Sequence, residues 1–139
     1  MPAKNIYHNL VKNALIKVGW TITDDPLSLQ FGGIDLYVDL GAEQLIVAEK
    51  ESQKIAVEIK SFLGESLISE FHTAVGQFLN YQLVLEEMKP NHTLYLAVPL
   101  EVYNAFFKHR LLPQKVIQRY RLNLIVYDIQ QEVIVKWIN

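Results

Sequence analysis

The sequence has no cysteine, no long apolar run and no excess of basic residues. Without cysteine, the chain has no disulfide, thiolate zinc site or cysteine nucleophile. No apolar run approaches the roughly 20 residues that a helix needs to cross a bilayer, and the N-terminus lacks the apolar core of a signal peptide. These absences predict a protein without a membrane span that resides in the reducing cytoplasm.

The charge balance limits how the chain could hold nucleic acid. It has 13 basic and 15 acidic residues, a net charge of −2. Proteins that bind nucleic acid through general electrostatics usually carry a clear basic excess. Any contact with DNA would therefore come from a local patch or from a partner.

Length and hydrophobic patterning predict one α/β domain spanning residues 1–139. Half of the residues are hydrophobic, which is ample for one core. Apolar spacing predicts helices at 4–18, 67–88, 100–107 and 114–120, and strands at 20–23, 34–40, 45–49, 54–60, 93–98, 122–127 and 132–137. A strand, the 67–88 helix and another strand in succession imply a parallel crossover beside an antiparallel meander. We therefore expect a mixed β-sheet flanked by helices.

Glu58 and Lys60 are the first candidates for catalytic chemistry. They lie two residues apart on a predicted strand, so both side chains leave the same face. A carboxylate can hold Mg²⁺ or Mn²⁺ against a phosphodiester, and an ammonium can stabilise the charge that develops on the phosphoryl oxygens. The alternative is an ordinary half-exposed strand with polar residues outward.

A second carboxylate is needed because one carboxylate rarely holds Mg²⁺ tightly. With a hairpin turn near Ser52, Ile46 would lie opposite Glu58. Glu43 would then be the nearer acid, and Asp39 would reach the site only if the chain bends back at residues 40–42. The alternative is that Glu43 and Asp39 are solvated loop acids.

Three further polar residues could support such a site. Gln77 and Tyr81 are four apart on the 67–88 helix and share a face, where Gln77 can bind a water or a phosphate. His8 lies on the first helix and could approach a metal ion or a phosphate. The alternatives are a solvated helix face for Gln77 and Tyr81 and a structural role for His8.

A run of the chain near residue 115 is basic. There is no acid between Glu101 and Asp128. This run could track a phosphate backbone, or it could be the solvated face of a short helix. The candidate DNA-binding residues are Lys108, Arg110, Lys115, Arg119 and Arg121, with His109 beside them.

The order of these features resembles that of PD-(D/E)XK nucleases: a polar residue on the first helix, an acid, Glu-x-Lys on a strand and Gln-x-x-x-Tyr on the next helix. The whole chain is more closely similar to the XisH family, the cyanobacterial fdxN-element excision controlling factors. The segments that carry this resemblance are PAKNIYHNLVKNALIKV, GWTITDDPL, FGGIDLYVDLGAE, AEKESQKIAVEIKSFLG, GQFLNY and VIVKW.

The resemblance implies a PD-(D/E)XK-like core and a role in DNA rearrangement during heterocyst differentiation, together with a site-specific recombinase and a XisI-type protein. Glu58, Lys60 and Gln77 match the nuclease motifs, whereas Leu45 stands where many such nucleases have the leading Asp.

Three functional interpretations follow. The first is a Mg²⁺-dependent endonuclease, the second is a non-catalytic module for a XisI-type protein or a recombinase, and the third is a DNA-binding accessory factor without a metal. In the module interpretation, the terminal strand 132–137 is the docking edge for the partner or for a second copy.

Overall fold

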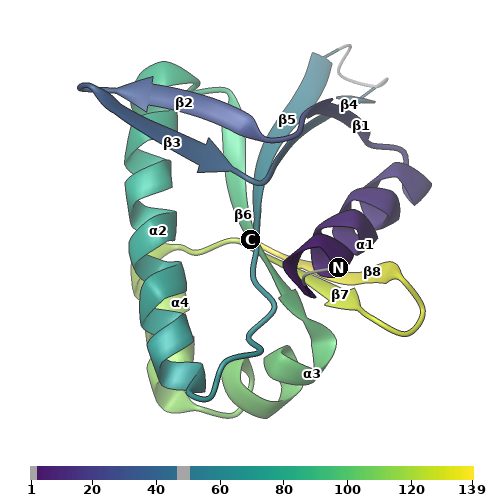
Figure 1. Cartoon of the computed structure of the whole chain (residues 1–139), viewed down its shortest axis with the longest axis vertical. Helices are drawn as coiled ribbons and strands as arrows, with labels where there is room; N and C mark the ends of the chain where they lie inside the picture. Colours follow the sequence, from purple (N-terminus) through teal and green to yellow (C-terminus); the bar gives the residue numbers. More distant parts are fainter. Residues whose placement is uncertain (1–2, 47–50) are drawn as a thin grey trace.

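A six-stranded mixed sheet crosses the middle of the structure, and helices cover both of its faces (Figure 1). The computed structural model describes residues 3–46 and 51–139. The strands of this sheet, in spatial order, are β1 (Thr21–Asp24), β4 (Leu40–Ile46), β5 (Glu51–Ile59), β6 (His92–Pro99), β7 (Leu124–Asp128) and β8 (Val133–Ile138). The pairs β5–β6 and β6–β7 are parallel, and the other pairs are antiparallel.

Four helical segments connect or cover these strands. They are α1 (Ala3–Lys17), α2 (Leu67–Met88), α3 (Leu100–Val102), which continues into the π-helical turn η1 (Tyr103–Phe107), and α4 (Leu111–Tyr120). None of the helices in the described ranges is long and apolar enough to span a membrane.

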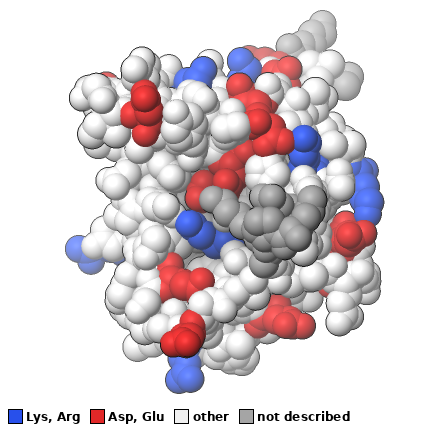
Figure 2. Space-filling view, viewed as in Figure 1, with Lys and Arg blue, Asp and Glu red and all other residues white. Residues whose placement is uncertain are grey.

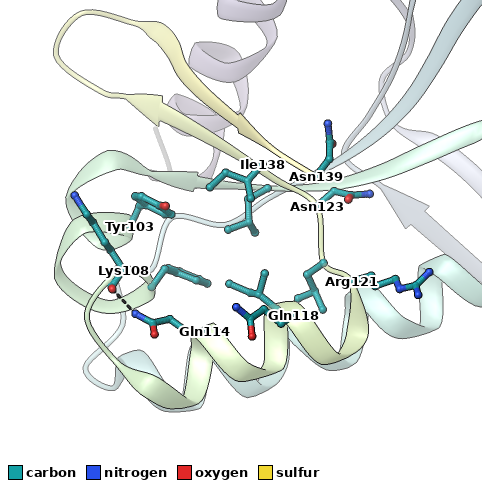
Figure 3. Close-up of a pocket in the computed structure, with 12 residues that line it drawn as sticks. Tyr103, Lys108, Gln114, Gln118, Arg121, Asn123, Ile138 and Asn139 are labelled. Carbon is teal, nitrogen blue, oxygen red and sulfur yellow. Dashed lines mark hydrogen bonds between the residues drawn. The ribbon is translucent and has the colours of Figure 1, made fainter.

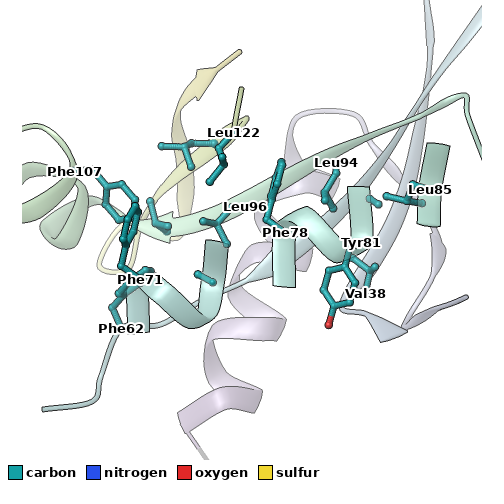
Figure 4. Packing of buried hydrophobic residues seen from close by; sticks show 14 of the residues in the cluster. Val38, Phe62, Phe71, Phe78, Tyr81, Leu85, Leu94, Leu96, Phe107 and Leu122 are labelled. Atoms are coloured by element: carbon teal, nitrogen blue, oxygen red, sulfur yellow. The ribbon is translucent and has the colours of Figure 1, made fainter. Parts of the chain in front are cut away.

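The sheet separates two hydrophobic clusters. Helix α1 packs on one face over Ile55, Val57 and Ile59, the odd-numbered residues of β5. On the other face α2 and α4 pack over Ala56 and its neighbours, and Figure 4 shows this second cluster. Each buried large apolar side chain contributes about 1.5–3 kcal/mol through its removal from water. Because Ala56 belongs to the cluster under α2, the even-numbered residues of β5 face α2, and Glu58 leaves the sheet on that side.

Local signals explain where α1 and α2 begin and end. Ser66 caps α2, accepting a hydrogen bond from the Ser69 amide, and the helix ends just before Pro90. Helix α1 ends at Lys17, and Gly19, two residues later, adopts a φ of +96° that favours glycine. The predicted helix 67–88 is confirmed residue for residue, and the first helix is confirmed within one residue at each end.

One element was missed by the sequence analysis. Residues Leu27–Phe31 form strand β2, which pairs with β3 (Ile34–Val38) in a separate two-stranded hairpin. Gly32 and Gly33 both have positive φ and make the two-residue turn, a recognised hairpin signal. Leu27 and Val38 anchor this hairpin against the α2 side of the core. The predicted strand 34–40 is thus two strands, because the chain leaves the hairpin at Val38 and enters the main sheet at Leu40.

The predicted turn at Glu51–Gln53 is wrong. These residues belong to β5 and pair with Gln44, Leu45 and Ile46 of β4. The pairing places Leu40 opposite Val57, both fully buried against α1. Burial of this apolar pair fixes the register, and it outweighs the local turn propensity of Glu-Ser-Gln. Residues 47–49 of the predicted strand 45–49 lie outside the described residues.

The remaining expectations describe the sheet well. Strand β5, helix α2 and strand β6 form the expected parallel crossover, and the antiparallel pairs β4–β5 and β7–β8 complete a mixed sheet flanked by helices. The predicted helix 100–107 is divided into α3 and η1, and α4 begins at Leu111 instead of residue 114.

Candidate functional site

The candidate site lies where β5 leaves the sheet. Glu58 is the buried charged residue among those described, with 6% of its surface exposed. Because it follows Ala56 by two residues, it points to the α2 side of the sheet. The Lys60 ammonium lies 3.5 Å from the Glu58 carboxylate and keeps a quarter of its side chain exposed. The structure thus confirms that the Glu-x-Lys pair shares one face.

Asp39 completes a carboxylate pair with Glu58. The β4–β5 register, extended by one residue beyond Leu40 and Val57, puts Asp39 opposite Glu58. The Asp39 amide donates to Glu58 Oε1 at 3.3 Å, and the Ile59 amide donates to Asp39 Oδ2 at 2.8 Å. These reciprocal bonds hold both carboxylates against the backbone of the neighbouring strand.

The pair is electrostatically strained. Burial, followed by the negative charge of Asp39, raises the pKa of Glu58 to about 7, and the Lys60 ammonium offsets only part of that rise. Ionised Glu58 is therefore disfavoured beside the Asp39 charge. A further positive ion bound at the pair would relieve this.

Helix α2 covers this pair with Tyr81. Burial, and then the charges of Glu58 and Asp39, raise the pKa of Tyr81 to about 12, so its phenol stays protonated and can donate a hydrogen bond. Gln77 lies one helical turn earlier on the same face as Tyr81. Its Oε1 is buried without a hydrogen-bond partner, which is unusual for a native polar atom.

An open hollow of about 270 Å³ adjoins Lys60. It is bounded by Lys60 and Ser61 from the end of β5, and by Glu70 and Thr73 from α2. Thr73 precedes Gln77 by four residues, so the stripe Thr73–Gln77–Tyr81 runs along the side of α2 that meets Lys60 and Glu58. Figure 2 shows acidic side chains gathered in a band on the face seen in Figure 1, with a basic side chain against the end of the band.

The expectation that Glu43 lies nearest to Glu58 is wrong. Glu43 pairs with Lys54 and with Thr21 of β1, four residues along β4 from Asp39. Leu45 lies farther still, opposite Ser52, and 65% of its surface is exposed. The misplaced turn caused this error, and the acid beside Glu58 is Asp39.

His8 lies beside Asp39 but is engaged elsewhere. It lines a narrow crevice with Tyr7, Asp39 and Ser61. Its Nε2 lies 2.7 Å from Asp25 Oδ1, and Lys12 donates to the other oxygen of Asp25 at 2.7 Å. Partial burial acts to raise the pKa of Asp25, but the hydrogen bonds from Lys12 and His8 outweigh it and lower that pKa. The sequence analysis missed this ion cluster, which ties α1 to the β1–β2 connection.

The five candidate DNA-binding residues lie together around α4. Lys108 follows η1, Arg110 caps α4, and Arg121 ends α4 in a left-handed conformation with a φ of +54°. Lys115 and Arg119 lie on α4 itself, and all five side chains are exposed.

The donor set of the site suits a hard divalent cation. Asp39 and Glu58 offer carboxylate oxygens only, which Mg²⁺ and Mn²⁺ prefer over nitrogen or sulfur. Within residues 3–46 and 51–139, no group of three or more His, Asp or Glu side chains is arranged to hold a metal. Mg²⁺ sites commonly use one or two carboxylates and complete the shell with water and substrate phosphate, so the pair fits that kind of site.

Comparisons with known proteins identify the family. The family model described as "XisH protein" matches residues 1–135. The chain belongs to the XisH family. It is similar to the crystal structure of a XisH family protein from Nostoc punctiforme, with 47% identity over 96% of this chain and 99% of that one, and a TM-score of 0.88.

A second solved structure is equally similar. It is an fdxN element excision controlling factor protein from Anabaena variabilis, 48% identical over 97% of this chain and 99% of that chain, with a TM-score of 0.88. A search of curated proteins gives no match. At these identities, the relatives share the XisH fold along nearly the whole chain.

Proposed function

We propose that this XisH domain is a controlling factor for the excision of a DNA element, and that it hydrolyses phosphodiester bonds with Mg²⁺ in a PD-(D/E)XK-like core. The excision role follows the name of the Anabaena variabilis relative. The observation that carries the hydrolytic role is the hydrogen-bonded pair of Asp39 and Glu58, with the Lys60 ammonium 3.5 Å from Glu58.

In this proposal Asp39 and Glu58 would hold the ion. A divalent cation bound there would polarise a phosphate and lower the pKa of a bound water. Lys60 meets the charge that develops on the phosphoryl oxygens, since its ammonium is partly exposed beside the pair. Gln77 accepts a hydrogen bond from the attacking water through its unpartnered Oε1. The water oxygen bonds to phosphorus, one ester P–O bond breaks, and the proton lost by the water ends on the leaving oxygen, so that a hydroxyl and a phosphate monoester result.

The test is a plasmid-nicking assay with and without Mg²⁺. Asp39→Asn should abolish nicking, while Glu43→Gln, a matched acid on the next strand, should leave it unchanged. Loss of nicking in both variants, or in neither, would contradict the assignment. Thermal unfolding of both variants shows whether either change acts through the fold.

A second candidate function is a non-catalytic interaction module. It is favoured by β8, which lies at the edge of the sheet with Val135 49% exposed, and by the net charge of −2. An edge strand can accept another strand. In this proposal a XisI-type protein, a site-specific recombinase or a second copy of the chain docks there and supplies the DNA surface. Light scattering of the purified chain, alone and with a XisI-type protein, distinguishes a lone monomer from such an assembly.

A further inference from the structure

A separate hollow of about 560 Å³ lies between α4 and the β7–β8 edge of the sheet (Figure 3). Its volume is typical of a small-molecule or single-residue binding pocket. The floor is apolar and is formed by Phe107, Ile117, Leu122, Leu124 and Ile138. The tyrosine ring of Tyr103 closes one end.

The rim of the hollow has hydrogen-bonding groups of both kinds. Gln114 Nε2 donates to the Lys108 carbonyl, and Asn123 Nδ2 donates to the Leu94 carbonyl at 3.1 Å. The side-chain oxygens of Gln114 and Asn123 accept no hydrogen bond from the described residues. Asn139 Oδ1 accepts a hydrogen bond from Tyr95, which lies on the α1 side of the sheet. Gln118 lines the same rim. Gln114 and Gln118 border the hollow from α4, and Asn123 and Asn139 border it from the sheet (Figure 3). Amides of this kind can donate to and accept from the edge of a nucleobase.

The charged side chains that line the hollow are both basic. Lys108 stands at the Tyr103 end and Arg121 at the opposite end, as Figure 3 shows. Among the described residues, no acidic side chain lines the hollow. A third cation, Lys136, lies 5.4 Å from the centre of the Tyr103 ring. Cations at both ends suit a ligand with a negative charge on each side of an apolar centre.

We propose that this hollow binds one unstacked base of a single-stranded nucleic acid, with the flanking phosphates at Lys108 and Arg121. The base lies on the apolar floor beside Tyr103 and pairs its edge with the amides of the rim. A free mononucleotide has phosphate on one side only and leaves one of the two cations without a partner. The proposal does not depend on the carboxylate pair, because none of the residues lining the hollow belongs to that site.

The test is fluorescence anisotropy with a labelled single-stranded octanucleotide in EDTA, so that cleavage cannot contribute. Lys108→Glu should weaken binding roughly tenfold. Lys89→Glu makes the same charge change on an exposed residue outside the hollow and should have at most a twofold effect. Thermal unfolding checks that both variants are folded.

The ligand itself supplies the second arm of the test. Replacing the bases of the octanucleotide by abasic sites should weaken binding at least about fivefold, because the stacking contact is lost. Equal loss in Lys89→Glu and Lys108→Glu, equal binding of the abasic strand, or equally tight binding of poly-glutamate, of a mononucleotide or of the duplex would each overturn the proposal. Failure of plasmid nicking leaves this outcome unaffected.

Discussion

The two polar regions of the domain are built on opposite plans. At the end of β5 two carboxylates lie close together, and each accepts a hydrogen bond from a backbone amide: Glu58 from Asp39, and Asp39 from Ile59. Around α4 the charges are cations, they stand apart on an exposed rim, and the centre between them is apolar.

This difference suits the two regions to different tasks: the carboxylate pair to metal-dependent catalysis, and the basic rim to the binding of nucleic acid. A buried pair of like charges gains most from a compact cation or a proton. An exposed basic rim gains from a long polyanion whose counterions it releases. A chain of net charge −2 can therefore carry a local surface for nucleic acid, provided that acids and bases are placed in different parts of the fold.

The largest effect that separates the two regions should come from Lys60→Ala. If Lys60 stabilises charge on the phosphoryl oxygens, the nicking rate should fall about 10²–10³-fold with little change in melting temperature. Lys54→Ala is the matched control, since Lys54 leaves the same face of β5 six residues earlier and pairs with Glu43. Equal losses of activity and folding in Lys60→Ala would mean that the lysine is structural.

The next effect concerns stability and pH. The pKa of Glu58 is about 7 in the fold and about 4.5 when unperturbed, so the folded state binds a proton that the unfolded state has released. The free energy of unfolding should therefore fall as the pH rises from 4.5 to 7, by up to about 3 kcal/mol. Glu58→Gln removes this dependence and should be more stable than the wild type at pH 8, but not at pH 4.

Urea unfolding at the two pH values, in EDTA, measures this difference. Glu87→Gln changes an exposed acid of α2 and should show no gain at pH 8. If the free energy of unfolding depends on pH in the same way in Glu58→Gln as in the wild type, then burial and the Asp39 charge do not disfavour ionised Glu58 in the folded state.

A smaller effect on stability is expected at Gln77. Its Oε1 has no partner to lose, so Gln77→Leu should change the free energy of unfolding by less than about 1 kcal/mol. The same change should lower nicking about tenfold or more if the oxygen orients the water. Asn80→Leu, on an exposed face of α2, is the control. A large loss of stability in Gln77→Leu alone would assign the residue to the fold.

A feature of the fold or of the site could be predicted from the sequence where its signal lies within a single helix or strand. Helix α2 could be predicted because the apolar spacing from Phe71 to Leu85 and the stop at Pro90 both act locally. The pairing of Glu58 with Lys60 needed only the two-residue period of a strand. Both signals lie within one element.

The acid beside Glu58 could not be chosen in the same way. Its identity depends on the β4–β5 register, which is set by burial of Leu40 and Val57 against α1 and not by the residues of the turn. The hollow beside α4 is also a tertiary feature, because its floor comes from η1, α4, β7 and β8. A sequence reading could see the basic residues there, but not the apolar space between them.

The smallest expected effect is a change in the salt dependence of nucleic-acid binding at α4. Arg119→Gln should lower the slope of log affinity against log salt by about 0.7 for single-stranded DNA, the value for one lost phosphate contact. The same variant should leave nicking of a bound plasmid unchanged at low salt. An unaltered slope would place Arg119 outside the nucleic-acid surface.

The central claim is that Asp39 and Glu58 form a divalent-cation site, and anomalous diffraction from a crystal soaked in Mn²⁺ tests it most directly. The account predicts an anomalous peak within coordination distance of both carboxylates, lost in Asp39→Asn. A crystal in which Mn²⁺ occupies other positions, while the two carboxylates keep their hydrogen bonds and the contact with Lys60, would contradict it.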